Sequence, residues 1–179
     1  MTARELFAKH GFQAVATQEI VSAAGTTRGA LYHHFRDKED LFCAVYEQIE
    51  SELSAEIGQV VGSSVNSPWE ALTRGGQLFL SACARAEVQR IVLIDAPSVL
   101  GWDRWREIGS RYGLGLIEGA VAAAIEAGEI EPRPVSAVAH MLLGAIDELA
   151  LVLARADDRT AAQGEAQATF AWLLQSLRR

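Results

Sequence analysis

Residues 12–43 read FQAVATQEIVSAAGTTRGALYHHFRDKEDLFC. In this stretch an apolar stripe with helical spacing, the turn Gly25-Thr26-Thr27 and a second short helical segment follow one another. A helix, a tight turn with glycine, and a second helix small enough for a DNA major groove about 12 Å wide make up a helix-turn-helix. We therefore expect this stretch to fold as a helix-turn-helix.

Local signals set the expected helix ends in this region. Thr17 is a favourable N-cap for a helix that Gly25 stops, and Asp37 can cap a longer helix that begins near Lys38. Gly11 suits the left-handed position after a first short helix. The apolar residues expected to lock the helices together are Ile20, Ala23, Ala24, Leu31 and Phe35.

The rest of the chain also has the apolar period of helices, and no segment alternates as a half-buried strand would. The Gly- and Ser-rich stretch 62–68 interrupts the pattern. Pro97 with Gly101, and later Pro132 with Pro134, separate the helices that follow. These helices are expected at about 68–84, 86–95, 103–128, 134–156 and 159–178.

Composition restricts the class of protein. Half of the residues are hydrophobic and 22% are charged, which is typical of a folded globular chain. The formal net charge is −7, but residues 1–45 hold as many cations as acids, so the negative excess lies in the remainder. The charged first residues do not form a signal peptide, so we expect a cytoplasmic protein without a membrane partner. Cys43 and Cys83 lie in apolar helical patterns and are expected to be buried thiols.

The helix-turn-helix pattern resembles the N-terminal domain of TetR-family repressors. The matching features are Thr17, Ala24-Gly25, TTRGALYHHF at 26–35, Lys38 and Leu41-Phe42. The resemblance implies a homodimeric transcriptional repressor that binds a pseudo-palindromic double-stranded DNA operator and is released by a small-molecule effector. Family members usually have a longer first helix and a basic arm. Either the true start lies upstream, or DNA binding here depends on fewer phosphate contacts.

The resemblance also implies which residues meet DNA. They are Thr17, Thr26, Thr27, Arg28, Gly29, Tyr32, His33 and Lys38. Hydroxyls and helix N-terminal amides at Thr17 and Thr26 would bind phosphates, Arg28 would reach base edges, and Lys38 would contact a phosphate. Tyr32 could instead be core packing. Adjacent histidines on a helix point about 100° apart, so His33 and its neighbour predict no metal site.

The resemblance and the break at 62–68 predict an all-α protein of about nine helices. A three-helix helix-turn-helix domain would occupy 1–45, and a larger helical ligand-binding and dimerisation domain would occupy 46–179, with a linking helix at about 38–60. The ligand is expected to shift populations by moving this helix. Candidate pocket residues, each of which could be ordinary core, are Trp69, Leu72, Phe79, Cys83, Trp102, Trp105, Tyr112, Leu116, His140 and Met141.

Two further features of the body leave alternatives open, and a third predicts how the chain forms a dimer. The stretch 91–109 places two tryptophans beside a proline and a glycine, which is typical of a mobile pocket wall or of a packed kink. Asp95, Asp147 and Glu148 lie among apolar residues, where a carboxylate could pair with a cationic ligand or with an arginine of the protein. An isologous four-helix dimer interface is expected from Leu142, Ile146, Leu149, Leu153, Phe170, Leu173 and Leu177.

Motifs for catalysis are missing from the sequence. It contains no nucleophile elbow, P-loop, dinucleotide fingerprint or metal-binding triplet, so we expect neither an enzyme nor a bound cofactor. The alternative is a protein-interaction module of the same fold that does not bind DNA, which the acidic body would suit. The two are separated by whether duplex binding falls steeply with salt.

Overall fold

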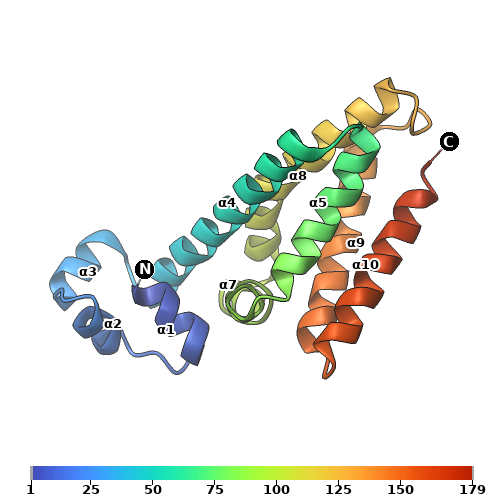
Figure 1. Ribbon diagram of the computed structural model, residues 1–179. Helices are drawn as coiled ribbons and strands as arrows, with labels where there is room; N and C mark the ends of the chain where they lie inside the picture. Colours follow the sequence, from blue (N-terminus) through green and yellow to red (C-terminus); the bar gives the residue numbers. More distant parts are fainter. Residues whose placement is uncertain (1, 179) are drawn as a thin grey trace.

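The computed structural model describes residues 2–178, apart from the side chain at position 64. Every regular element in this range is helical (Figure 1), which confirms the all-α prediction. The elements are α1 (Thr2–His10), α2 (Thr17–Ala23), α3 (Arg28–His34), α4 (Lys38–Ser64), α5 (Pro68–Cys83), α6 (Ala86–Val88), the π-helix η1 (Gln89–Asp95), α7 (Ala96–Leu100), α8 (Trp102–Glu126), α9 (Val135–Arg155) and α10 (Arg159–Gln175). Because α6, η1 and α7 form one uninterrupted run, the described residues contain nine helical units.

Three aromatic rings hold the N-terminal part together. Phe7 of α1 and Phe12 of the following loop lie 5.3 and 5.1 Å from Phe42 of α4, measured between ring centroids, and both meet it edge to face. Such pairs add to the stability that burial itself provides. Four further buried side chains complete this core: Val15, Ile20, Val21 and Leu31. The first turns of α4 thus belong to the same core as α1, α2 and α3.

In the N-terminal part, the helix ends follow the expected signals with one exception. Gly11 and Gly25 have φ angles of 79° and 61°, in the left-handed region that favours glycine. The carboxylate of Asp37 caps α4 by accepting a backbone hydrogen bond of 2.8 Å. The prediction that Thr17 caps α2 was wrong, because Ala16 occupies the N-cap and Thr17 is already the first helical residue.

The contact between α2 and α3 uses fewer alanines than expected. Ile20 and Leu31 are buried and Phe35 packs partly against the core, as predicted. Ala23 and Ala24 are exposed instead. They form the last residue and the C-cap of a seven-residue helix, so they lie beyond the apolar stripe that its first turns present to the core.

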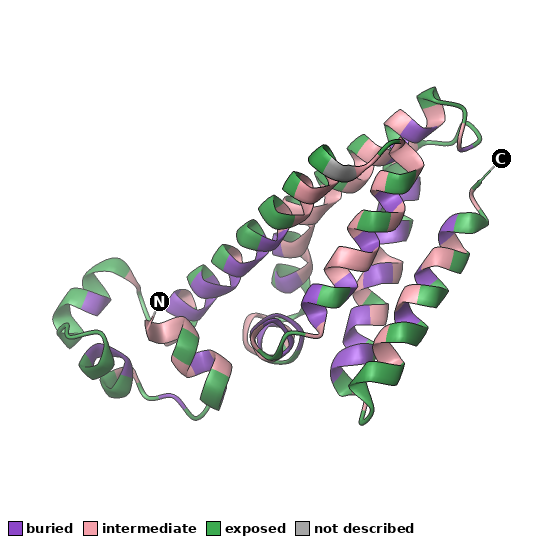
Figure 2. Cartoon of the chain, in the orientation of Figure 1, coloured by how far each residue is buried: buried purple, intermediate pink, exposed green. Residues whose placement is uncertain are grey.

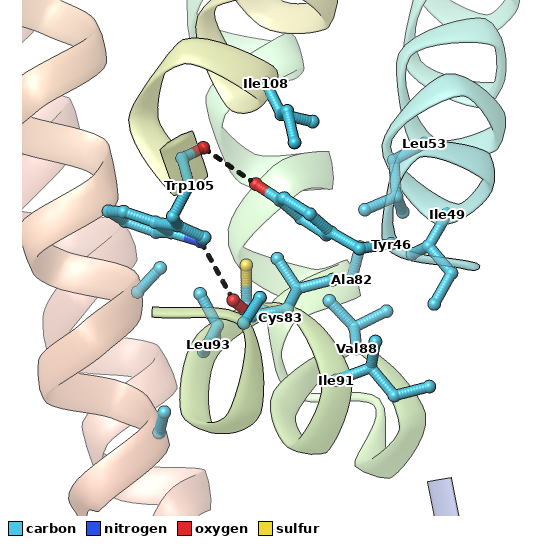
Figure 3. Close-up of a cluster of buried hydrophobic side chains, with 14 of the residues drawn as sticks. Tyr46, Ile49, Leu53, Ala82, Cys83, Val88, Ile91, Leu93, Trp105 and Ile108 are labelled. Carbon is cyan, nitrogen blue, oxygen red and sulfur yellow. Dashed lines mark hydrogen bonds between the residues drawn. The ribbon is translucent and has the colours of Figure 1, made fainter. Parts of the chain in front are cut away.

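The run from α6 to α7 contains a change of hydrogen-bond register. Through η1 the amides donate to carbonyls five residues back. Pro97 has no N–H to donate to Val92 in this register, and the Val92 carbonyl instead accepts a bond of 2.9 Å from the indole Nε1 of Trp105 (Figure 3). The expected break at Pro97 is therefore bridged, and the run ends only at Gly101. With Trp105 4% exposed, this segment is a packed kink.

Five long helices, α4, α5, α8, α9 and α10, form the body, and α4 continues into it from the N-terminal part (Figure 1). Their buried residues lie on the sides that face one another (Figure 2). Among the described helices, α9 is the one long and apolar enough by composition to cross a membrane. Half of that stretch is buried inside the protein, as is usual for a core helix.

Candidate DNA-binding surface and ligand cavity

The helix α3, which we call the recognition helix, stands clear of the molecule at one end (Figure 2). Leu31 is its one buried residue, and the side chain of Thr27 caps it by accepting a bond from the Ala30 amide. A helix held by a single buried anchor leaves most of its circumference free for a groove. Its exposed residues include Arg28, Gly29, Tyr32 and His33, and Thr26 before it is exposed as well.

Three of the predicted DNA-binding residues come together on this surface. Hydrogen bonds to Thr17 and then to Arg28 lower the pKa of the Tyr32 phenol, and the Arg28 guanidinium lies 5.5 Å from the Tyr32 ring centroid. Tyr32 is 39% exposed, so its hydroxyl faces solvent rather than the core. The cluster joins the start of α2 to the recognition helix and presents a cation beside two hydroxyls.

Lys38 is placed differently from the expectation of a free phosphate ligand. Its ammonium donates to the carbonyls of Phe12 at 2.9 Å and Val15 at 3.0 Å, and lies 4.2 Å from the centroid of the Phe12 ring. An ammonium has three donor hydrogens, so one remains beyond these two bonds. The residue therefore ties the loop between α1 and α2 to the start of α4.

The N-terminal part is bonded to the run α6–η1 by charged groups. Arg4 of α1 donates to both carboxylate oxygens of Glu87, at 2.6 and 2.8 Å. The amide of Phe12 donates to Asp95 at 2.7 Å, and Arg90 reaches the same carboxylate oxygen at 3.2 Å. Asp95, considered above as a carboxylate for a cationic ligand, is thus paired with an arginine of the protein.

The contact between Arg90 and the loop after α1 requires a glycine at position 11. A Cβ built on Gly11 would lie 1.8 Å from Nη2 of Arg90, and its φ of 79° also disfavours other residues. The guanidinium of Arg90 therefore lies directly on the backbone of the loop after α1. A side chain at position 11 would have to displace it.

A cavity of about 140 Å³ lies inside the body, enclosed by α4, α5, η1, α8, α9 and the ring of Phe170 from α10. Five of the predicted pocket residues line it: Leu72, Phe79, Trp105, Tyr112 and Leu116. Trp105 connects two walls, because its carbonyl accepts a bond of 3.0 Å from the Tyr46 hydroxyl while its indole bonds η1 (Figure 3). Sequence patterns had grouped these residues only as candidates.

The other five predicted pocket residues lie outside the cavity. Trp69 packs under Arg178, with the guanidinium carbon 5.2 Å from the ring centroid. Cys83 is fully buried among other side chains, and Trp102 is half exposed. His140 and Met141 are exposed because they fall on the side of α9 that faces away from the bundle. Both cysteines are free and buried, as expected.

The polar part of the cavity was mostly missed from the sequence. Glu50 is 8% exposed and lines the cavity, and burial raises its pKa to about 7. Asp147 also lines it, with its pKa raised by burial to about 6, whereas Glu148 is exposed. One sequence pattern could have identified Glu50 as a cavity residue. Tyr46, Glu50 and Ser54 are spaced by four residues, which places the glutamate on one side of the helix beside the apolar stripe of α4.

Five glycines in the middle of long helices also face the cavity: Gly58, Gly75, Gly76, Gly109 and Gly113. Each costs about 1 kcal/mol of helix stability relative to alanine, and the missing methyl groups leave the cavity larger. At Gly76 a Cβ would lie 2.2 Å from the Phe170 ring, which needs that position to close the wall. The remaining four leave 3.7 Å or more to the nearest side chain.

The expected dimer residues are mostly internal. Leu142, Ile146, Leu153 and Phe170 are buried within the protomer, and three of these four line the cavity. Leu149, Leu173 and Leu177 are partly buried against the same core. The stripes were read correctly as apolar, but they face inward, so a partner subunit would meet the opposite sides of α9 and α10. The large apolar side chains exposed there are Met141, Val152 and Trp172.

The described residues contain no cluster of three or more His, Cys, Asp or Glu arranged to hold a metal ion. The rings of His33 and His34 meet edge on, 5.3 Å apart between centroids. The polar groups exposed on and just before the recognition helix are the hydroxyls of Thr26, Thr27 and Tyr32, the guanidinium of Arg28 and the imidazoles of His33 and His34. These are the groups that meet DNA phosphates and base edges.

Comparison with known proteins gives matches to both parts of the chain. The model "Bacterial regulatory proteins, tetR family" matches residues 1–45, and "Tetracyclin repressor-like, C-terminal domain" matches 69–177. The Transposon Tn10 TetC protein of Escherichia coli is 25% identical over 177 residues, 99% of this chain and 89% of that protein. The HTH-type transcriptional regulator AcrR of Shigella flexneri is 47% identical over 51 residues, 28% of this chain and 24% of that protein.

Among solved structures, a TetR-family transcriptional regulator from Pectobacterium atrosepticum has the same fold with a TM-score of 0.88. It is 30% identical, and the match covers 99% of this chain and 90% of that one. The C-terminal model alone spans more than half of the residues. This chain therefore belongs to the TetR family of bacterial regulatory proteins, helix-turn-helix regulators of transcription that bind operator DNA.

Proposed function

We propose that this protein is a cytoplasmic, homodimeric repressor that binds a pseudo-palindromic operator through the recognition helix and leaves it when a small molecule fills the cavity. The observation that carries the proposal is the recognition helix itself, exposed on all sides but Leu31, with Arg28 and Tyr32 at its surface. An exposed short helix with a cation near its N-terminus suits the major groove. Regulation rather than catalysis is the proposed activity.

The cavity supports the effector part of the proposal. Two proteins with the same fold have been solved with small molecules: FadR from Bacillus subtilis with stearoyl-CoA, and RolR with resorcinol. Each is 18% identical to this chain with a TM-score of 0.75, so they share the fold alone. We propose residues 1–45 as the DNA-binding domain and 46–179 as the ligand-binding and dimerisation domain, with α4 shared.

Two routes lead from the cavity to the DNA-binding domain. The first is α4. Its residue Glu50 lines the cavity, and its residue Phe42 packs in the N-terminal core. The second is η1, whose Val92 and Leu93 line the cavity while Asp95 holds the Phe12 amide. A ligand that moves either wall changes how the DNA-binding domain is held. Operator DNA must then weaken ligand binding by the same factor.

The dimer proposal uses the outward sides of α9 and α10. Met141 and Val152 are eleven residues apart, which returns to the same side of a helix after three turns, and Trp172 on α10 is 72% exposed. Exposed apolar side chains mark an interface when they gather in one patch, and we propose that these three do so on the outward sides of α9 and α10. Trp172→Glu is expected to give monomers in sedimentation velocity. Ile94→Glu, at an exposed apolar residue of η1, should leave the dimer intact.

The DNA-binding proposal is tested with the DNA that flanks the protein's own gene. Fluorescence anisotropy across a salt series is expected to show tighter binding than to a shuffled duplex, with affinity falling steeply as salt rises. Equal binding to both duplexes, or none, would instead favour the interaction module without DNA binding. Sedimentation of the protein-DNA complex then gives its stoichiometry, for which we expect two protomers per operator.

A further inference from the structure

Two acidic side chains are among the residues that line the cavity. Glu50 of α4 and Asp147 of α9 both line it. Burial raises the pKa of Glu50, a hydrogen bond with Tyr46 lowers it, and the charge of Asp147 raises it further. In the part of the chain that the structure describes, neither has an arginine or lysine within ion-pair distance. Two acids are thus enclosed together without a direct counterion.

Among the described residues one cation, Arg106, lines the cavity, and it forms no ion pair with either carboxylate. Arg106 lowers the pKa of Asp147, but burial outweighs it and the pKa is still raised to about 6. The Arg106 guanidinium carbon lies 5.9 Å from the centroid of the Trp102 ring, which is half exposed. Two carboxylates against one guanidinium leave the lining acidic.

The rest of the lining is apolar, supplied by leucine, isoleucine, valine and aromatic side chains, and the helical glycines enlarge it. Burial of a carboxylate is costly unless an opposite charge compensates it. A neutral molecule in this space would leave that cost unrelieved, and an anion would add to it. A molecule with an apolar body and a cationic group matches both parts of the cavity.

We infer that the effector of this protein is an apolar molecule with one protonated amine, whose nitrogen lies against Glu50 and Asp147 while its body fills the space beside Phe79 and Ile146. This inference rests on the proposed function, because it takes the cavity as the effector site. It adds the chemical class of the ligand and assigns the two carboxylates as its specificity-determining residues.

A matched series of probes tests the charge alone. 4-Phenylbutylamine, 4-phenylbutanol and 4-phenylbutyrate share one apolar body and carry a cation, a neutral hydroxyl and an anion at neutral pH. Isothermal titration calorimetry with the full-length dimer is expected to rank them in that order, with the amine at least about tenfold tighter than the alcohol. Equal affinities, tighter binding of the butyrate, or no binding of any probe would overturn the inference.

Isosteric variants test the residues. Glu50→Gln and Asp147→Asn should each weaken the amine by about tenfold and leave the alcohol within about twofold. Glu56→Gln, an exposed glutamate of the same helix paired with Arg85, is the matched control and should change neither. Circular dichroism of each variant confirms that it folds. An amine affinity that survives in the double variant Glu50→Gln, Asp147→Asn would contradict the assignment.

The pH dependence provides a second readout. Groups that interact with the two carboxylates are Tyr46 on α4, Cys83 on α5 and Arg106 on α8. Burial raises the pKa of the phenol and the thiol further from neutrality, so between about pH 6 and 8 only the carboxylates change charge. Amine affinity should therefore rise with pH and level off above about 7 in the wild type, and stay flat in the double variant. A flat wild-type profile would contradict the inference.

Different experiments can reject the proposed function and this inference independently of one another. Operator binding without any probe tests the first, and calorimetry without DNA tests the second. If the operator is bound but the amine is not preferred, the repressor stands and the ligand class is wrong. If the amine is preferred but no DNA is bound, the cavity assignment stands and the regulatory proposal falls.

Discussion

The polar groups of the DNA-binding surface and of the cavity differ in their exposure to solvent. Arg28 and Tyr32 are exposed and keep their hydration, with Thr17 half-buried beside them, whereas Glu50 and Asp147 line a cavity where burial raises their pKa values. Removal of a surface group should therefore affect binding but not stability. Removal of an enclosed carboxylate should weaken ligand binding and stabilise the fold, since its desolvation is relieved.

The largest effect is expected where the two regions share a core. Phe42→Ala removes the ring that Phe7 and Phe12 both pack against, which should lower the free energy of unfolding by about 3–5 kcal/mol. Thermal melts measure the loss, and Ile94→Ala, at an exposed site, should cost less than about 1 kcal/mol. Hydrogen exchange should rise in α1 to α3 more than in α10. A uniform rise would mean that the regions unfold as one unit.

Glu50→Gln should stabilise the protein above neutral pH. The folded pKa of about 7 lies above the ordinary value of 4.5, so this group's contribution is fully present below about pH 4.5 and is lost as pH rises through 7. At about pH 8 the variant should be more stable by at most roughly 3 kcal/mol, and its profile should be flatter. Urea denaturation at several pH values measures this. Parallel profiles for variant and wild type would show that Glu50 is not desolvated.

Arg28→Ala is expected to weaken operator binding by about 1–3 kcal/mol without changing the melting temperature. The guanidinium is exposed and packs only over Tyr32, so the fold does not depend on it. Anisotropy with the operator measures the loss. Lys9→Ala removes an exposed cation of α1 and serves as the charge control. If both variants lost affinity equally, the effect would be general electrostatics rather than base contact.

The smallest effect is expected at the joint between the regions. Asp95→Asn weakens the bonds from the Phe12 amide and Arg90, which should speed hydrogen exchange of α1 by about fivefold to tenfold, equivalent to about 1 kcal/mol. Glu129→Gln is the matched control, because it also removes a carboxylate that accepts a backbone amide, that of Trp69. Unchanged exchange in Asp95→Asn would show that the bonds to Asp95 do not hold α1, and would leave α4 and the Arg4–Glu87 pair as the connections between the cavity and the DNA-binding domain.

Sequence reasoning succeeded where structure depends on neighbours in the chain. The ends at Gly11 and Gly25 and the cap at Asp37 are set within four residues, and each was predicted. Family resemblance identified the helix-turn-helix for the same reason, since its spacing is local. The cap at Thr17 failed by one residue, because the residue before it took the N-cap position.

The cavity was harder to predict because six elements from distant parts of the chain enclose it. Periodicity identified the apolar stripes of α9 and α10 but not which side meets a partner, so Leu142 and Phe170 were assigned outward and lie inward. Glu50 was overlooked, because a glutamate in a helix is normally a solvated residue. Bridging of Pro97 by Trp105 depends on a contact from the next helix, which no local rule contains.

The position of Trp105 gives the protein an optical reporter of its own. Of the four tryptophans, it is the one whose ring lines the cavity, and its indole N–H is bonded to the carbonyl that the π-helix leaves open. Replacing Trp69, Trp102 and Trp172 by phenylalanine would leave one emitter at the wall between the cavity and η1. Its emission in a stopped-flow experiment would then report the arrival of a molecule in the cavity.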